Sequence, residues 1–173
     1  TDNGIGFTSL NMRSFLTLDS EYKANKGGRG VGRLLWLKAF RRANINSVYE
    51  DDDAKLKSRK FIFSATSGVS EEKVTDIAPG TTRITSVHLD GFGARYREAS
   101  RKTTRAIANS LFEHCLWYFV REGGAPRIVI KDDDEHVTLD DVYHEHMVSS
   151  AETERIAIKD KEFDLTHIKL RAN

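Results

Sequence analysis

The chain has 173 residues, of which 39% are hydrophobic and 31% charged, and its formal net charge is +1. This length suits one ordinary domain with a real core, and the near-neutral charge excludes a polycation. The only cysteine, Cys115, excludes a disulfide framework and is typical of a reducing compartment, so we expect a cytoplasmic protein. No apolar run is as long as a membrane span, and we expect no membrane partner.

The first half of the chain predicts two helices followed by strands. A short helix is expected over residues 10–18 and a second, largely buried helix over residues 30–43, where apolar side chains cover most of the circumference. Residues 19–28 are polar and predict a surface loop before the second helix. Strands are predicted at 45–49, 59–65, 73–77 and 83–89 from their β-branched and aromatic content.

The second half opens on a long helix. Apolar residues at spacings of three and four predict a helix over residues 98–120, which the glycines and proline of residues 123–126 end. A strand is predicted at 127–130, and the acidic run 132–135 is interpreted as a turn between strands. Residues 137–147 suit either a helix or a strand, and residues 155–158 and 163–170 predict a hairpin that turns at 159–161.

This order of elements favours an α+β fold. Strands that follow one another without regular helix alternation indicate a two-layer sandwich, with helices on one face of a mixed, mostly antiparallel sheet. A doubly wound parallel sheet is the less favoured alternative. Because the first residue is Thr1 and the first motif begins at residue 2, we expect the chain to be part of a longer protein.

The glycine-rich segment 27–32 is the strongest functional signal. Its backbone N–H groups can point into one concave space, and the helix predicted to follow adds its own unpaired N–H groups and the positive end of its dipole. Such a segment predicts an anion site, most commonly for a phosphate chain. It does not match a P-loop, which ends in Gly-Lys-Ser or Gly-Lys-Thr, or a dinucleotide fingerprint, which follows a strand.

Two further segments accompany the glycine-rich one. Residues 2–7 place an aspartate before alternating glycines, and a carboxylate that only accepts hydrogen bonds suits an exocyclic amine such as that of adenine. Gly80 and Thr81 form a turn that leads into a predicted strand, with a small hydroxyl directly after the glycine. Each segment alone is also a plain turn or hinge signal.

Together and in this order, the three segments resemble the nucleotide-binding motifs of the Bergerat-fold ATPases, over about residues 1–90. That superfamily includes ATPase domains of type II topoisomerases, heat-shock chaperones, histidine kinases and mismatch-repair proteins. The resemblance implies that the carboxylate of Asp2 accepts the adenine amine, that the glycines of its motif curve the backbone around the base, and that Thr81 binds a water bridging Asp2 and adenine. The residues to which the resemblance assigns nucleotide contacts are Asp2, Gly4, Gly6, Lys26, Gly27, Gly28, Arg29, Gly30, Val31, Gly32 and Thr81.

The resemblance also implies what lies outside this chain. The family uses a helix upstream of the aspartate motif, which supplies a glutamate base for the attacking water and an asparagine for Mg²⁺. That first helix would precede Thr1, so no catalytic or metal-binding residue is assigned here, and we expect this chain alone to bind ATP weakly. In the complete protein we expect ATP hydrolysis coupled to conformational change or homodimerisation. Residues 1–125 would form the ATP-binding domain, and residues 126–173 the end of its sheet or the start of a transducer-like domain.

A non-catalytic interaction module is the alternative function. Residues 95–105 carry Arg95, Arg97, Arg101, Lys102 and Arg105 against one acid, a pattern that suits nucleic acid or simply a solvated helix face. A metal site could be built from His136, His144 and His146, but no second ligand pair completes a zinc set. We therefore interpret them as surface histidines. Cys115 is interpreted as a buried structural thiol.

Overall fold

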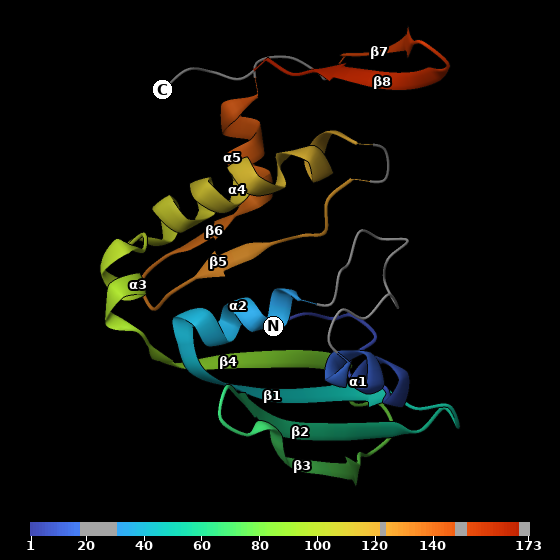
Figure 1. Ribbon diagram of the computed structural model, residues 1–173, viewed down its shortest axis with the longest axis vertical. Helices are drawn as coiled ribbons and strands as arrows, with labels where there is room; N and C mark the ends of the chain where they lie inside the picture. Colours follow the sequence, from blue (N-terminus) through green and yellow to red (C-terminus); the bar gives the residue numbers. More distant parts are fainter. Residues whose placement is uncertain (18–30, 122–123, 148–151, 170–173) are drawn as a thin grey trace. The chain divides into compact units, whose positions relative to one another are not determined.

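The computed structural model describes residues 1–17, 31–121, 124–147 and 152–169 (Figure 1). The chain divides into two compact units, Thr1–Ala99 and Ser100–Asn173. This division lies earlier in the chain than the boundary predicted after residue 125.

The first unit contains an antiparallel sheet of four strands in the order β3-β2-β1-β4. Its strands are β1 (Phe40–Glu50), β2 (Leu56–Ser64), β3 (Gly68–Asp76) and β4 (Ile84–Phe92). They correspond to the strands predicted from the sequence, and each is longer than predicted. All of their pairings are antiparallel, so the sheet is not the mixed one that we expected.

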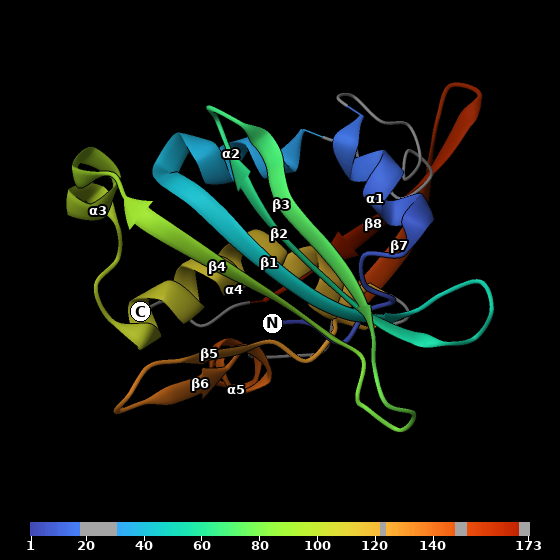
Figure 2. The same cartoon turned by 90° about the horizontal axis from the view of Figure 1, so that it is seen from below.

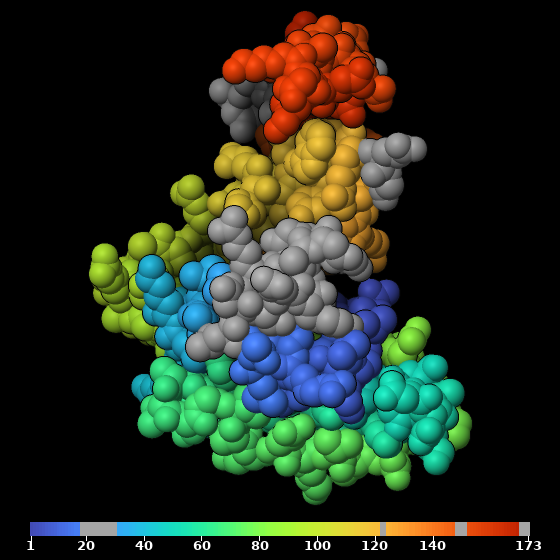
Figure 3. Space-filling view, turned by 45° about the vertical axis from the view of Figure 1, so that its right-hand side comes forward, coloured from blue at the N-terminus to red at the C-terminus, as the bar shows by residue number. Residues whose placement is uncertain are grey.

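Helices α1 (Ser9–Leu16) and α2 (Gly32–Ala39) lie on one face of this sheet (Figure 2). The alternation of strand side chains turns Ala43, Ile45, Phe61 and Phe63 to that face, where they form a core with Met12 of α1. Phe15 of α1 and Trp36 and Leu37 of α2 pack against the same cluster. Figure 3 shows the layering in space-filling form, with α1 in blue over the green and teal atoms of the sheet. The predicted two-layer α+β arrangement is therefore confirmed for this unit.

The helix predicted over residues 30–43 is shorter and less buried than we expected. It ends at Ala39 because Phe40 takes an extended conformation, with φ −124° and ψ 153°, and begins β1. None of its residues is fully buried, and Leu34 and Leu35 are 41% and 65% exposed. Apolar residues all around a helix favour burial on all sides, but this helix buries only the side that carries Trp36 and Leu37.

The helix predicted over residues 98–120 is two helices. Helix α3 (Ala94–Ala99) closes the first unit, and α4 (Thr104–Val120) opens the second. The break lies at Thr103, whose backbone is extended and whose hydroxyl accepts a hydrogen bond from the N–H of Ala106. Threonine competes well as an N-cap because its side chain satisfies an N–H group that the first turn leaves unpaired.

The second unit packs α4 and α5 (Leu139–His146) with the short hairpin of β5 (Val129–Lys131) and β6 (His136–Thr138). Its core contains Ala108 and Phe112 of α4 together with Val137, Leu139 and Val142. The acidic run 132–135 turns between β5 and β6, as predicted, because the Asp132 carboxylate accepts the N–H groups of Asp134 and Glu135. The ambiguous segment 137–147 is therefore both the end of a strand and a helix.

A separate hairpin of β7 (Glu152–Ile158) and β8 (Lys161–His167) confirms the last predicted element. Its strands are antiparallel and pair Arg155 with Asp164 and Ile156 with Phe163. None of the helices in the described ranges has the length and hydropathy that crossing a lipid bilayer requires.

Candidate nucleotide site

The N-terminal glycine loop, residues 2–8, is fastened to the outer edge of the sheet. The N–H of Asp2 donates to the carbonyl of Thr85, and the N–H of Thr85 donates to the carbonyl of Asp2, each over 2.8 Å. Thr85 belongs to β4, the last strand in the order of the sheet, so Asp2 continues the hydrogen bonding beyond that edge. The backbone of Asp2 is therefore held at a defined place on the first unit.

The carboxylate of Asp2 is exposed and only partly used by the protein. Its Oδ1 atom accepts a hydrogen bond of 2.9 Å from the N–H of Gly4. Among the described residues, no other group donates to this carboxylate. A carboxylate has two oxygens and about four acceptor positions, so Asp2 retains acceptor capacity for an amine or a water.

Beneath the loop lies a pair of buried hydroxyl groups. Ser47 of β1 and Thr85 of β4 are 0% and 3% exposed, and their side-chain oxygens are 2.8 Å apart. Ser47 Oγ also accepts a hydrogen bond of 2.9 Å from the N–H of Phe7. The hydroxyl pair thus connects the loop, β1 and β4, and satisfies polar groups that would otherwise be costly to bury.

Gly6 is a residue at which the backbone of the loop lies close against the sheet. Its φ is +76°, and a Cβ built there would lie 2.7 Å from Ser47 Oγ and 2.9 Å from Tyr49 Cβ. Asn11 of α1 fixes the same residue by donating a hydrogen bond of 2.6 Å to its carbonyl. At Gly6 the group that the backbone approaches is the sheet, and the curving of Gly4 and Gly6 around a base, which the resemblance implies, stays a prediction.

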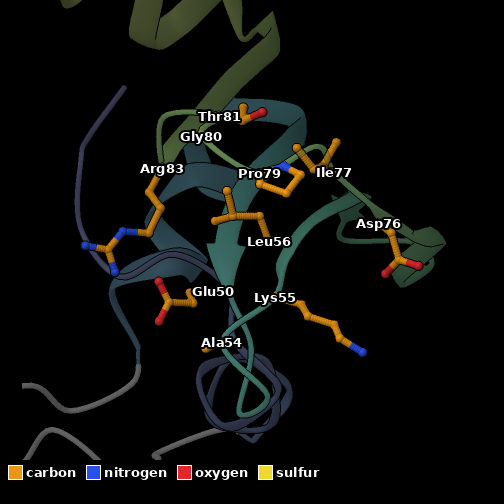
Figure 4. Close-up of a pocket in the computed structure, with 10 residues that line it drawn as sticks. All are labelled: Glu50, Ala54, Lys55, Leu56, Asp76, Ile77, Pro79, Gly80, Thr81 and Arg83. Atoms are coloured by element: carbon orange, nitrogen blue, oxygen red, sulfur yellow. The ribbon is translucent and has the colours of Figure 1, made fainter.

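Thr81 lies elsewhere in the first unit. Its hydroxyl donates to the carbonyl of Ala78 over 2.9 Å, within the turn between β3 and β4. It lines a cavity of about 700 Å³ at the end of the sheet, and Asp2, Gly4 and Gly6 are not among the described residues around that cavity. Figure 4 shows Leu56, Ile77 and Pro79 at its centre, with Glu50 and Arg83 to one side. The threonine that the structure brings to Asp2 is Thr85, not Thr81.

The predicted phosphate loop is described only at its end. Lys26, Gly27, Gly28, Arg29 and Gly30 lie outside the described residues. Val31 is the N-cap of α2 with φ −98° and ψ −14°, and it makes no side-chain capping hydrogen bond. A Cβ at Gly32 would meet none of the described residues within 4 Å. The phosphate role of residues 26–32 stays a prediction.

Three residues that support the loop were missed by sequence reasoning: Ser47, Thr85 and Arg59, whose guanidinium donates to the carbonyls of Phe7 and Thr8. Each is a polar residue at a core-facing position of a strand, in register with buried apolar neighbours such as Ile45 and Phe61. The sequence did carry a signal for them, which is a polar side chain at a strand position where the alternation calls for an apolar one. Such a residue predicts a hydrogen-bond partner, because a buried polar group needs one.

The basic segment 95–105 is divided between the two units. Arg95 and Arg97 lie on α3 in the first unit, whereas Arg101, Lys102 and Arg105 lie in the second. Arg105 forms an ion pair with Glu145 of α5, so one of the predicted cations is neutralised.

Metal-ligand residues do not cluster in the part of the chain that the structure describes. There, no three His, Cys, Asp or Glu side chains come together in a way that could hold a metal ion. Cys115 is half-buried on α4.

Comparison of the chain with protein-family models, curated proteins and solved structures gives no significant match.

Proposed function

We propose that this chain binds an adenine nucleotide at the glycine loop of residues 2–8, as part of a Bergerat-type ATPase. The observation that carries the proposal is the placement of Asp2. Its backbone is paired with Thr85, and its exposed carboxylate has one oxygen on the N–H of Gly4 and acceptor capacity to spare.

The chemistry of this carboxylate suits the exocyclic amine of adenine. An amine donates hydrogen bonds, and an ionised carboxylate only accepts them. The hydrogen bond from Gly4 fixes the orientation of the carboxylate before a ligand arrives, which lowers the entropy lost on binding. The phosphate chain would then reach residues 26–32, whose glycines and helix N-terminus suit an anion.

The resemblance implies that a threonine hydroxyl holds a water between the aspartate and the base, but neither threonine hydroxyl is bonded to the Asp2 carboxylate in the described structure. Thr85 is joined to Asp2 through the backbone, while its buried hydroxyl is paired with Ser47. The hydroxyl of Thr81 donates to the carbonyl of Ala78. We therefore expect Thr81→Ala to leave nucleotide affinity within about twofold of the parent protein, because its hydroxyl serves the turn at Ala78.

Hydrolysis is proposed for the complete protein on the resemblance alone. The glutamate base and the Mg²⁺-binding asparagine of the family precede the aspartate motif, and no described residue is assigned to either role. What this chain contributes is binding and orientation of the base, through Asp2 and the loop that holds it.

A thermal shift experiment on the longer protein that the resemblance implies, with the helix upstream of the aspartate motif, tests the proposal. ATP at about ten times its Kd stabilises the folded state by about 1.4 kcal/mol and should raise the Tm by several degrees. Asp2→Asn should abolish this shift, because an amide has one acceptor oxygen for two donors and turns its NH₂ towards the adenine amine.

Asp53→Asn is the matched control. Asp53 is exposed in the turn between β1 and β2, and its substitution should leave the ATP shift unchanged. An unchanged melting curve of the parent protein at millimolar ATP, or an equal shift in Asp2→Asn, would contradict the proposal.

A further inference from the structure

Arg59 of β2 occupies a position where the strand pattern calls for an apolar residue. It lies on the same face of β2 as the buried Phe61 and Phe63, and its side chain is only 9% exposed. A buried guanidinium is costly unless its charge and its N–H groups are satisfied. The contacts of Arg59 therefore indicate why a charged side chain lies at this buried position.

Those contacts converge on the glycine loop. Nη1 of Arg59 donates to the carbonyl of Phe7 over 2.6 Å and to the carbonyl of Thr8 over 3.0 Å. Thr8 is also the N-cap of α1, so the guanidinium binds the backbone where the loop joins the helix. These contacts join residues that are 52 and 51 positions apart in the sequence.

The other side of the guanidinium is held by the sheet. Glu72 of β3 places Oε1 at 3.1 Å from Nε, and the guanidinium lies over the ring of Tyr49 with its carbon 5.1 Å from the centroid. The charge is thus neutralised by one strand and its plane supported by another. Nε itself makes no hydrogen bond with a described residue, so the sheet supports the charge of the guanidinium while its donated hydrogen bonds go to the loop.

We propose that Arg59 is the positioning residue of the nucleotide site: it holds the backbone of residues 7 and 8 so that Asp2, Gly4 and Gly6 keep the geometry that receives the base. This inference rests on the proposed nucleotide function. Ser47 and Asn11 fix the same loop at Phe7 and Gly6, and Arg59 adds a charge-assisted contact to it.

Lysine is the informative substitution. Arg59→Lys keeps the positive charge but has no planar fork, so it cannot donate to the carbonyls of Phe7 and Thr8 and also meet Glu72. We expect about tenfold weaker ATP binding at a temperature where the variant is fully folded, and faster amide exchange confined to residues 4–8.

Two further variants distinguish a role of Arg59 in positioning the glycine loop from a role in the stability of the first unit. Glu72→Gln removes the ion pair that supports the guanidinium but leaves both hydrogen bonds to the loop, so the loss of ATP affinity should be smaller than in Arg59→Lys. Arg42→Lys is the matched control, since Arg42 also binds a carboxylate, that of Asp90, on β4. It should change neither ATP affinity nor exchange in the loop.

The outcomes distinguish the two proposals. If the parent protein binds ATP and Arg59→Lys binds it equally well, the positioning role is overturned. If the parent protein does not bind ATP while Arg59→Lys still loosens residues 4–8, the nucleotide function fails and the anchoring of the loop stands.

A measurement on the parent protein covers the case in which Arg59→Lys does not fold. Arginine side-chain NMR should show slow rotation of the Arg59 guanidinium and a change in its signals when ATP is added. Fast rotation, or signals that stay unchanged although the parent protein binds ATP, would overturn the positioning role.

Discussion

The side-chain oxygens of Ser47 and Thr85 lie 2.8 Å apart, buried on the sheet face that α1 and α2 cover. The two residues are directly opposite each other in the pairing of β1 with β4. Because Ser47 also accepts from the N–H of Phe7 and Thr85 pairs with Asp2, this contact joins both ends of the glycine loop to the sheet. The loop is therefore ordered by the sheet and not by its own sequence alone.

Ser47→Ala should destabilise the first unit. The substitution leaves the N–H of Phe7 and the hydroxyl of Thr85 without their shared partner, and buried unsatisfied groups of this kind cost about 2 kcal/mol. Denaturant unfolding measures the change in the free energy of unfolding. Ser86→Ala, on the opposite face of β4, is the control and should change it by less than about 0.5 kcal/mol. Equal effects of the two substitutions would mean that the hydroxyl pair contributes no stability.

Gly6→Ala and Gly68→Ala should differ, although both glycines have positive φ. At Gly68, with φ +62°, nothing lies within 4 Å of a new Cβ, so alanine there carries only the conformational cost of about 1 kcal/mol. At Gly6 the new Cβ also collides with Ser47 and Tyr49, and we expect a loss of about 3 kcal/mol. Thermal and denaturant unfolding of the two variants measure the difference, and a loss at Gly6 no larger than at Gly68 would show that the loop does not approach the sheet as described.

Acid should weaken the second unit through Asp132. The side-chain hydrogen bond from Thr104, together with the N–H groups of Glu135 and Asp134, holds the pKa of the Asp132 carboxyl below its ordinary value. A carboxyl whose pKa is lower in the folded state contributes stability above its unfolded pKa, about 4, and this contribution is lost as pH falls through the folded pKa.

The free energy of unfolding measured from pH 7 to pH 3 tests this dependence. It should fall at acid pH in the parent protein and fall less steeply in Asp132→Asn, which cannot be protonated. Asp133→Asn should keep the parent slope, because no hydrogen bond to its carboxylate is present in the described structure. Parallel slopes for the parent protein and Asp132→Asn would contradict the assignment.

Local patterns predicted most elements because their signals are local. The strands of the sheet, the acidic turn after β5 and the β7–β8 hairpin all follow from alternation and turn residues. The two errors in helices have physical causes as well. Residues 40–43 are recruited into β1 by pairing with β2 and β4, and Thr103 caps α4 instead of continuing a helix. Tertiary pairing and a side-chain cap outweighed intrinsic helix propensity in these places.

The candidate site likewise combines features that the sequence alone predicts with contacts that only the tertiary structure creates. The sequence by itself determined that residues 2–7 form a glycine turn with an acceptor side chain and that an α+β sheet follows, because composition and spacing encode both. Only the tertiary structure decided that Thr85 meets Asp2, that Ser47 lies beneath the loop and that Arg59 holds its backbone. These contacts depend on strand register, which brings together residues 38 to 83 positions apart, and register is set by how the whole core packs.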